Sequence, residues 1–169
     1  MSFSEDIRAA ADAVRSCREV TIISHIDADG ISSEAILAMA LSREGIHVST
    51  TFVRQLDPLT LDQVPDDSSL KIFSDLGSGQ QQMLMEKGLD PSRTIIIDHH
   101  VSQPADHGDP FIEVNCLNHG HEKMSAAGVS YLVAREIDSI NTDLAKLAVI
   151  GNVGDMMDRE HLRLTGPAR

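Results

Sequence analysis

The sequence is poor in aromatic side chains. Phenylalanine and tyrosine together make up 3% of its 169 residues, and tryptophan is absent. Base stacking on aromatic rings supplies much of the affinity with which proteins hold single-stranded nucleic acid, so this composition argues against strong single-strand binding by this chain alone. The core must be built mainly from Ile, Leu, Val, Ala and Met. A hydrophobic fraction of 41% and a charged fraction of 24% predict one globular domain rather than a disordered chain.

Basic residues are also in short supply. The chain has 14 Lys and Arg against 26 Asp and Glu, which gives a formal net charge of −12. Nucleic-acid binders usually carry a basic face, because neutralising phosphates supplies most of their affinity. The composition leaves two interpretations of the acidity open. The carboxylates serve solubility, or they are collected to hold cations, and the motifs favour the second.

The features that mark secreted and membrane proteins are missing as well. Cys17 and Cys116 do not have the paired spacing of a thiolate metal site, and two cysteines do not suggest a disulfide framework. We expect both to be buried, reduced thiols in a cytoplasmic protein. The first residues lack a basic stretch followed by an apolar one, and no apolar run approaches the roughly 20 residues of a membrane span. We therefore expect neither a signal peptide nor membrane association.

Strand and helix patterns alternate along the chain. The predicted strands are solid runs of β-branched residues rather than in-and-out alternations, which is typical of a parallel sheet covered on both faces. We predict strands at 20–24, 47–53, 70–74, 93–97 and 111–114, and helices at 7–17 (capped by Ser4), 32–43, 80–86, 125–137 and from a cap at Asn141 or Thr142 to about 150. The sequence thus predicts an α/β domain with a mostly parallel sheet over residues 1–158. Residues 159–169 are interpreted as the start of a linker to a C-terminal domain that this chain lacks.

Acidic residues follow three of the predicted strands. The segment His25-Ile26-Asp27-Ala28-Asp29-Gly30 follows the first strand, Asp75 follows the third, and Asp98-His99-His100 follows the fourth. The carboxyl ends of parallel strands meet at one edge of a sheet, so these side chains should converge. An extended backbone from 25 to 29 would send its three polar side chains to one side, with Gly30 allowing a tight turn into the next helix. We therefore expect a cluster of carboxylates and imidazoles at this edge.

Two further positions complete the candidates. Asp155 comes after the last predicted helix, in Gly154-Asp155-Met156-Met157-Asp158, where Asp158 is a nearby competitor. His119 and His121 lie in a polar loop that contains glycine, and we expect them to be solvated rather than functional.

The electrostatics of such a cluster favour bound metal. Four or five carboxylates on one rim repel one another and protonate, unless divalent cations become the largest local charges. Oxygen donors with one or two imidazoles and no thiolate suit Mn²⁺ or Mg²⁺ better than structural zinc. Asp75, isolated and central, is the candidate for a carboxylate that bridges two ions. Two such ions would activate a water and steady the charge of an in-line displacement at phosphorus, so we predict a metal-dependent phosphoester hydrolase.

In their order along the chain, these segments resemble the four motifs of the DHH phosphoesterase superfamily. The resembling positions are His25-x-Asp27-x-Asp29, Asp75, Asp98-His99-His100 and Gly154-Asp155. The resemblance implies that His25, Asp27 and Asp75 bind one ion. It implies that Asp29, Asp75, His99 and Asp155 bind the second. By the same resemblance, Asp98 orients its neighbours and His100 faces the substrate phosphate.

The spacing of the first motif is similar to that of the RecJ exonucleases. One residue separates His25 from Asp27, whereas small-substrate members of the superfamily resemble His-x-x-x-Asp-x-Asp. Asn115 and the segment Ser125-Ala126-Ala127-Gly128 are also RecJ-like, although Cys116 stands where many relatives have proline. The resemblance implies a 5′-to-3′ exonuclease specific for single strands of DNA or RNA. Single-stranded nucleic acid is then the expected substrate, held weakly by this chain, with replication or repair proteins as candidate partners.

Two alternatives stay open. The first is a small-substrate phosphodiesterase or phosphatase of the same superfamily, of the oligoribonuclease, cyclic-dinucleotide or pAp type. The low aromatic content and the acidic charge favour it slightly. The second is a non-catalytic RecJ-like replication scaffold. It is disfavoured because such relatives typically lose their metal residues, and every one of those positions is filled here.

Overall fold

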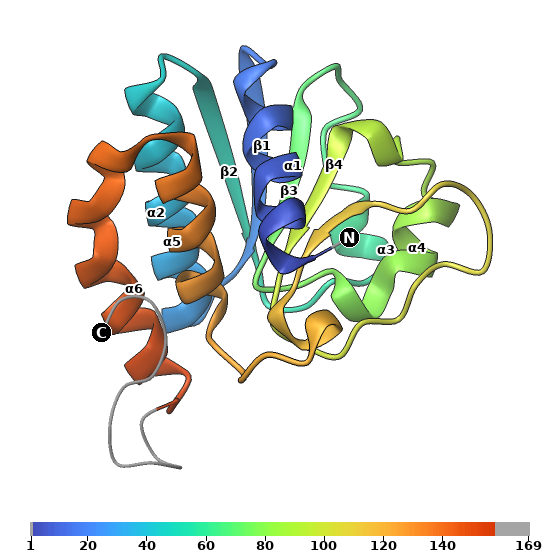
Figure 1. Ribbon diagram of the computed structural model, residues 1–169. Coiled ribbons are helices and arrows are strands. Elements are labelled where there is room, and N and C mark those ends of the chain that lie inside the picture. Colours follow the sequence, from blue (N-terminus) through green and yellow to red (C-terminus); the bar gives the residue numbers. More distant parts are fainter. Residues whose placement is uncertain (1, 158–169) are drawn as a thin grey trace.

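The computed structural model describes residues 2–157 and contains one five-stranded sheet (Figure 1). The strands are β1 (Glu19–His25), β2 (His47–Val53), β3 (Leu70–Ser74), β4 (Thr94–Ile97) and β5 (Ile112–Val114). Their order in the sheet is β2-β1-β3-β4-β5, and every neighbouring pair is parallel. The predicted α/β class is confirmed, and all five predicted strands are present within one or two residues of their expected bounds.

Helices cover both faces of the sheet. Four of them, α1 (Phe3–Arg15), α2 (Ala28–Arg43), α5 (Ala126–Ile137) and α6 (Ala145–Gly154), lie on one face, and the short helices α3 (Pro58–Leu61) and α4 (Gln81–Glu86) lie on the other (Figure 1).

Successive residues of the inner strands feed two separate cores. Ile22, Ile72 and Ile95 pack with the helices of the first face. Ile23, Phe73 and the other residues that alternate with them pack with α3 and α4. Side chains of a strand point alternately to its two faces, so burial on both faces requires the continuous apolar runs seen in the sequence.

Three helix starts differ from the predictions, because a different residue caps each helix. The helix predicted from residue 32 begins at Ala28, behind Asp27. Ser2, not Ser4, caps α1, in a reciprocal pair with Glu5. The last predicted helix has an extra first part. A 3₁₀ helix (Ser139–Leu144) begins behind Asp138, and α6 then runs on to Gly154. The predicted boundary at residue 158, and Asp158 itself, lie outside the described residues.

Two other expectations concern the cysteines and the membrane. Cys17 and Cys116 are both free thiols, and Cys116 is buried as predicted. Cys17 is only partly buried, because it follows the last turn of α1, so the prediction of its burial was wrong. Among the described residues, no helix combines the length and apolar character needed to cross a bilayer.

Small residues let α2, α5 and α6 pack closely beside the sheet. A Cβ atom added to Gly151 in α6 would lie 2.4 Å from the Cβ of Ala127 and 2.6 Å from Oδ1 of Asp29. The added methyl therefore meets both the start of α5 and a buried carboxylate. By contrast, a Cβ added to Gly128 in α5 has its nearest neighbour at 3.6 Å, an ordinary contact.

We predict that Gly151→Ala destabilises the protein. Overpacking at a tight helix junction costs about 1–3 kcal/mol, which outweighs the gain of about 1 kcal/mol in helix propensity. The matched control is Gly128→Ala, which adds the same methyl within a helix and should be neutral or slightly stabilising. Urea denaturation of both variants measures the free energy of unfolding. An unchanged value for Gly151→Ala would contradict the close packing.

Candidate metal centre

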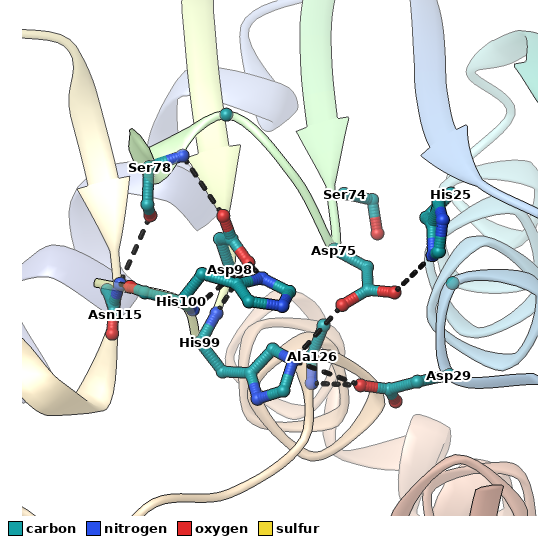
Figure 2. A network of polar contacts seen from close by, with 12 residues as sticks. His25, Asp29, Ser74, Asp75, Ser78, Asp98, His99, His100, Asn115 and Ala126 are labelled. Carbon is teal, nitrogen blue, oxygen red and sulfur yellow. Dashed lines mark hydrogen bonds and ion pairs between the residues drawn. The ribbon is translucent and has the colours of Figure 1, made fainter. Parts of the chain in front are cut away.

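The predicted site residues gather at the carboxyl ends of β1, β3 and β4. His25 is the last residue of β1, Asp75 follows β3, and Asp98 to His100 follow β4 (Figure 2). The sheet order reverses between β1 and β3, which is where parallel α/β sheets open a crevice for ligands. A cavity of about 430 Å³ lies there, lined in part by His25, Asp27, Arg54, Asp75, Asp98, His100 and Asp155.

The start of α2 corrects one sequence prediction. The backbone from 25 to 29 was expected to be extended, but α2 begins at Ala28 and Asp27 is its N-cap. Oδ1 of Asp27 accepts a hydrogen bond of 2.9 Å from the amide of Gly30. Gly30 also packs against His25 so closely that an added Cβ would lie 2.2 Å from the carbonyl oxygen of His25. Because the chain turns here, Asp27 and Asp29 do not form one row with His25 but belong to two different donor groups.

The first donor group contains His25, Asp27 and Asp75. Nδ1 of His25 lies 2.9 Å from Oδ2 of Asp27 and 3.6 Å from Oδ2 of Asp75. Its other ring nitrogen, Nε2, lies 3.1 Å from the carbonyl oxygen of Arg54. A carbonyl oxygen only accepts hydrogen bonds, so Nε2 carries the proton, and in the neutral ring the lone pair of Nδ1 faces two carboxylates. A cation between these three groups satisfies all of them.

The second donor group contains Asp29, His99 and Asp155. Nε2 of His99 lies 3.8 Å from Oδ2 of Asp29, and Nδ1 lies 3.6 Å from Oδ2 of Asp155. Asp29 is fixed by the start of α5, where the amides of Ala126 and Ala127 donate hydrogen bonds of 2.7 and 2.9 Å to its two oxygens. Asp155 is placed by α6, as the residue that ends this helix.

Asp75 stands between the two groups. Its Oδ2 faces His25, and its Oδ1 lies 3.2 Å from Nε2 of His99 (Figure 2). Its backbone is in the left-handed region, with φ of 60°, a conformation that costs a residue other than glycine about 1 kcal/mol or more. The strained turn aims the carboxylate across the crevice, and its amide is held by a hydrogen bond of 2.9 Å to the carbonyl of Ile97. Asp75 thus occupies the central position that the sequence predicted for a bridging carboxylate.

Burial and charge repulsion strongly perturb this cluster. Burial, followed by repulsion from Asp29, Asp27 and Asp98, raises the pKa of Asp75 to about 9. Burial also raises the pKa of Asp29, although two amides oppose the shift, and it lowers the pKa of His99. The metal-free cluster therefore holds less charge than its residue types suggest.

Three buried donor atoms of the cluster have no hydrogen-bond partner among the described residues. They are Oδ1 of Asp75, Nδ1 of His99 and Oδ2 of Asp155. Buried polar atoms are nearly always paired, so each of these needs an explanation. Carboxylate oxygens and imidazole nitrogens in two adjoining groups fit a pair of divalent cations, with Asp75 within reach of both.

Asp98 and His100 belong to a third possible donor group, with Asp75 and His99, but hydrogen bonds already occupy the carboxylate of Asp98. Asp98 is buried and accepts hydrogen bonds from the amides of Ser78 (3.0 Å) and His99 (2.7 Å) and from Nδ1 of His100 (2.7 Å). Burial alone would raise the pKa of Asp98, but the contacts to His100 and these amides outweigh it and lower the pKa. The same hydrogen bond raises the pKa of His100 against the effect of burial. Asp98 is thus engaged in fixing the loop, while His100 lines the cavity.

Some residues of the site and its surroundings were not foreseen. Ser78, whose amide holds Asp98, has no sequence signal beyond its place shortly after Asp75. His119 was expected to be solvated, but it is partly buried and its Nε2 lies 2.6 Å from Oδ2 of Asp6 in α1. His121 is exposed, as expected. Neither loop histidine belongs to a donor group among the described residues.

Solved structures with a similar fold include several RecJ proteins. An exonuclease RecJ bound to manganese superposes with a TM-score of 0.71 at 22% identity, over 92% of this chain and 43% of that one. RecJ from Thermus thermophilus in complex with Mn²⁺ gives 0.69 at 24% identity, over 89% and 24% of the two chains. CDC45 from Entamoeba histolytica gives 0.61 at 16% identity, over 96% and 34%. At these identities the similarity shows a shared fold.

Curated relatives are similar in sequence as well. The uncharacterized protein MJ0831 of Methanocaldococcus jannaschii is 34% identical over 149 residues, which are 81% of this chain and 33% of that protein. A putative SPbeta prophage-derived single-strand DNA-specific exonuclease, YorK of Bacillus subtilis, is 27% identical over 80% of this chain and 25% of its own length. The chain therefore spans about a third or less of these relatives. The family model for the N-terminal domain of the DHH family matches residues 19–152, and the chain belongs to the DHH family.

Proposed function

We propose that this chain is the catalytic domain of a phosphodiester hydrolase that uses two divalent ions, Mn²⁺ or Mg²⁺. One observation carries the proposal. Two adjoining donor groups share access to Asp75, and three of their buried donor atoms have no partner in the described part of the chain. Membership of the DHH family supports this chemistry. So do the RecJ structures of similar fold, which contain Mn²⁺.

The two donor groups define the proposed ligands. His25, Asp27 and Asp75 hold one ion, and Asp29, His99 and Asp155 hold the other, with Asp75 shared. Two ions in such a site supply an activated water and neutralise the charge that develops at phosphorus.

The other residues of the cavity act on the substrate and on the loop. The Asp98 carboxylate keeps His99 in place through the amide of His99. His100, whose pKa is raised, directs Nδ1 at Asp98, so its Nε2–H remains to donate to a phosphate oxygen. Arg54 lies on the wall of the same cavity and offers a second cation for phosphate.

Within this class, we propose a RecJ-like exonuclease that shortens single strands from the 5′ end. The single-residue gap between His25 and Asp27 supports this branch over the small-substrate branch. YorK, a relative by sequence, is described as a putative single-strand DNA-specific exonuclease. The scaffold alternative requires the donor set to be idle, which the buried unpaired donor atoms disfavour.

The substrate class is tested by incubating the chain with Mn²⁺ and 5′-labelled single strands of DNA, matched RNA, and a dinucleotide. We expect loss of the 5′ label as a mononucleotide from DNA or RNA, and little cleavage of matched duplex. Because the chain is acidic and poor in aromatic residues, high enzyme concentrations are needed. Hydrolysis of the dinucleotide with intact single strands would move the protein to the small-substrate branch. No hydrolysis by a chain that also fails to bind two Mn²⁺ in calorimetry would favour the scaffold.

Asp75→Asn should abolish hydrolysis and stabilise the metal-free protein. In the wild type, the carboxyl pKa rises from 3.8 to about 9 on folding. Between these values the folded state binds more protons than the unfolded state, so metal-free stability falls as the pH rises through this window. Asparagine removes that dependence. Thermal denaturation in chelator should give a higher midpoint for Asp75→Asn at pH 8. Added Mn²⁺ should raise the midpoint of the wild type much more than that of the variant, which keeps Asp29, His99 and Asp155. Equal Mn²⁺ stabilisation of both proteins would contradict a shared Asp75.

His99→Ala should weaken one of two bound ions. The variant removes an imidazole from the second donor group and leaves the first intact. Calorimetric titration with Mn²⁺ should show two ions per wild-type chain, with one of them bound about 10- to 100-fold more weakly in the variant. Excess Mn²⁺ should then restore part of the activity. His107→Ala, a change at an exposed loop residue, is the control and should titrate as wild type. Two unchanged sites in His99→Ala would remove His99 from the ligand set.

A further inference from the structure

The carboxylate of Glu113 in β5 accepts hydrogen bonds from five surrounding side chains. Its Oε1 accepts from the hydroxyl of Ser78 at 2.5 Å and, more weakly, from Nδ2 of Asn115 at 3.5 Å. Its Oε2 accepts from Gln81 at 2.9 Å, Ser102 at 2.8 Å and Asn118 at 3.0 Å. All five partners are neutral hydroxyl or amide groups, so the carboxylate is the common acceptor around which they are arranged. Neither donor group of the metal centre includes Glu113.

These partners come from three separate segments. Ser78 and Gln81 follow β3, Ser102 follows the His99–His100 pair, and Asn115 and Asn118 follow β5. In the register of the sheet, Glu113 pairs with Ile96 of β4, two residues before Asp98. The carboxylate therefore connects the loop after β4 to the segments on either side of it.

Ser78 extends the connection to the loop itself. Its amide donates to Asp98 at 3.0 Å, and its carbonyl accepts from the amide of Gln103 at 2.7 Å. Asn115 bridges the Ser78 hydroxyl, at 3.1 Å, and the carbonyl of His100, at 2.8 Å (Figure 2). Ser78 and Asn115 thus hold the loop from 98 to 103 by hydrogen bonds at Asp98, His100 and Gln103. Both residues also donate a hydrogen bond to Glu113.

The sheet gives this loop little other support. β5 pairs with β4 over only three residues, and beyond Ile97 one backbone bond, from Asp98 to the carbonyl of Val114, joins the loop to β5. The groups that support a metal ligand must themselves be fixed, because a small displacement of the ligand weakens metal binding. Side-chain hydrogen bonds must therefore fix the positions of His99 and His100.

We propose that Glu113 is a positioning residue, whose carboxylate orders the loop from 98 to 103 and so keeps His99 and His100 in place for metal and substrate. The consequence for Mn²⁺ and activity rests on the proposed function. The ordering of the loop does not.

The test compares Glu113→Gln with Glu34→Gln. Glutamine keeps the shape of the side chain but replaces one carboxylate oxygen with an NH₂ group. This group is itself a donor, so it cannot accept the hydrogen bonds that the oxygen accepted. Glu34 in α2 accepts a hydrogen bond from Thr50 at 2.7 Å and lies outside both donor groups, so it controls for loss of a hydrogen-bonded carboxylate. Amide hydrogen exchange is measured on each metal-free chain at His99, His100 and Gln103, with β1 and α2 as internal references. Mn²⁺ affinity is measured by calorimetry, and kcat and KM are measured on single-stranded DNA.

In Glu113→Gln, we expect the three loop amides to exchange about 3- to 10-fold faster, while β1 and α2 exchange as in the wild type. We also expect about 10-fold weaker binding of one Mn²⁺ and a lower kcat with little change in KM. Glu34→Gln should match the wild type in all three measurements. Wild-type loop exchange together with wild-type Mn²⁺ affinity in Glu113→Gln would overturn the proposal.

Three further outcomes can be told apart. If Glu113→Gln does not fold, Ser102→Ala removes a single donor to the carboxylate and is judged by the same loop amides, with a smaller acceleration expected. If the wild-type chain hydrolyses nothing, the proposed function fails, while the exchange data still decide the role of Glu113. Faster exchange throughout the sheet would indicate general destabilisation and would also overturn a positioning role.

Discussion

Repulsion among buried carboxylates is the constraint on which this structure depends. The fold relieves it at three positions with backbone amides. The start of α2 donates to Asp27, the start of α5 donates to Asp29, and the turn after β3 donates to Asp98. Helix starts carry partial positive charge, so these carboxylates are held where their charge is favourable. Asp75 has no such donor to its carboxylate among the described residues, and its pKa rises to about 9. The carboxylate that both donor groups share is therefore one that no backbone amide compensates in the described part of the chain.

The packing of the helices follows from the same requirement. For α5 to present its first amides to Asp29, its start must come close to α2 and α6, and small residues at Ala127 and Gly151 allow this approach. The close contact between these helices brings the amides of α5 to Asp29, and the hydrogen bonds to Asp29 in turn hold the start of α5 against α2. Asp155 at the end of α6 is carried to the site by this packing, although it lies far from the other donors in sequence.

The sequence predicts much of this arrangement, and the exceptions have physical causes. The strands were predictable because burial on both faces demands continuous apolar runs, and the donors were predictable because they follow those strands. The start of α2 was predicted wrongly. The alternation of polar and apolar residues from His25 to Asp29 suggested an extended chain, but Asp27 caps a helix, a position that aspartate strongly prefers. Glu113 had no signal in the sequence. One polar residue in a three-residue strand shows its role only when distant segments are seen to converge on it.

The net negative charge of the chain opposes binding of the proposed nucleic-acid substrate, but the charge close to the cavity differs from the net charge. The two donor groups contain four carboxylates, at Asp27, Asp29, Asp75 and Asp155, whose charge two divalent ions would balance. What remains at the cavity is Asp98 paired with His100, and the guanidinium of Arg54 on the wall. With both proposed ions bound, the site would be neutral to positive within a chain of net charge −12. Screening limits the reach of the distant carboxylates to about 10 Å, so a group that approaches the cavity is affected mainly by the charge at the strand ends.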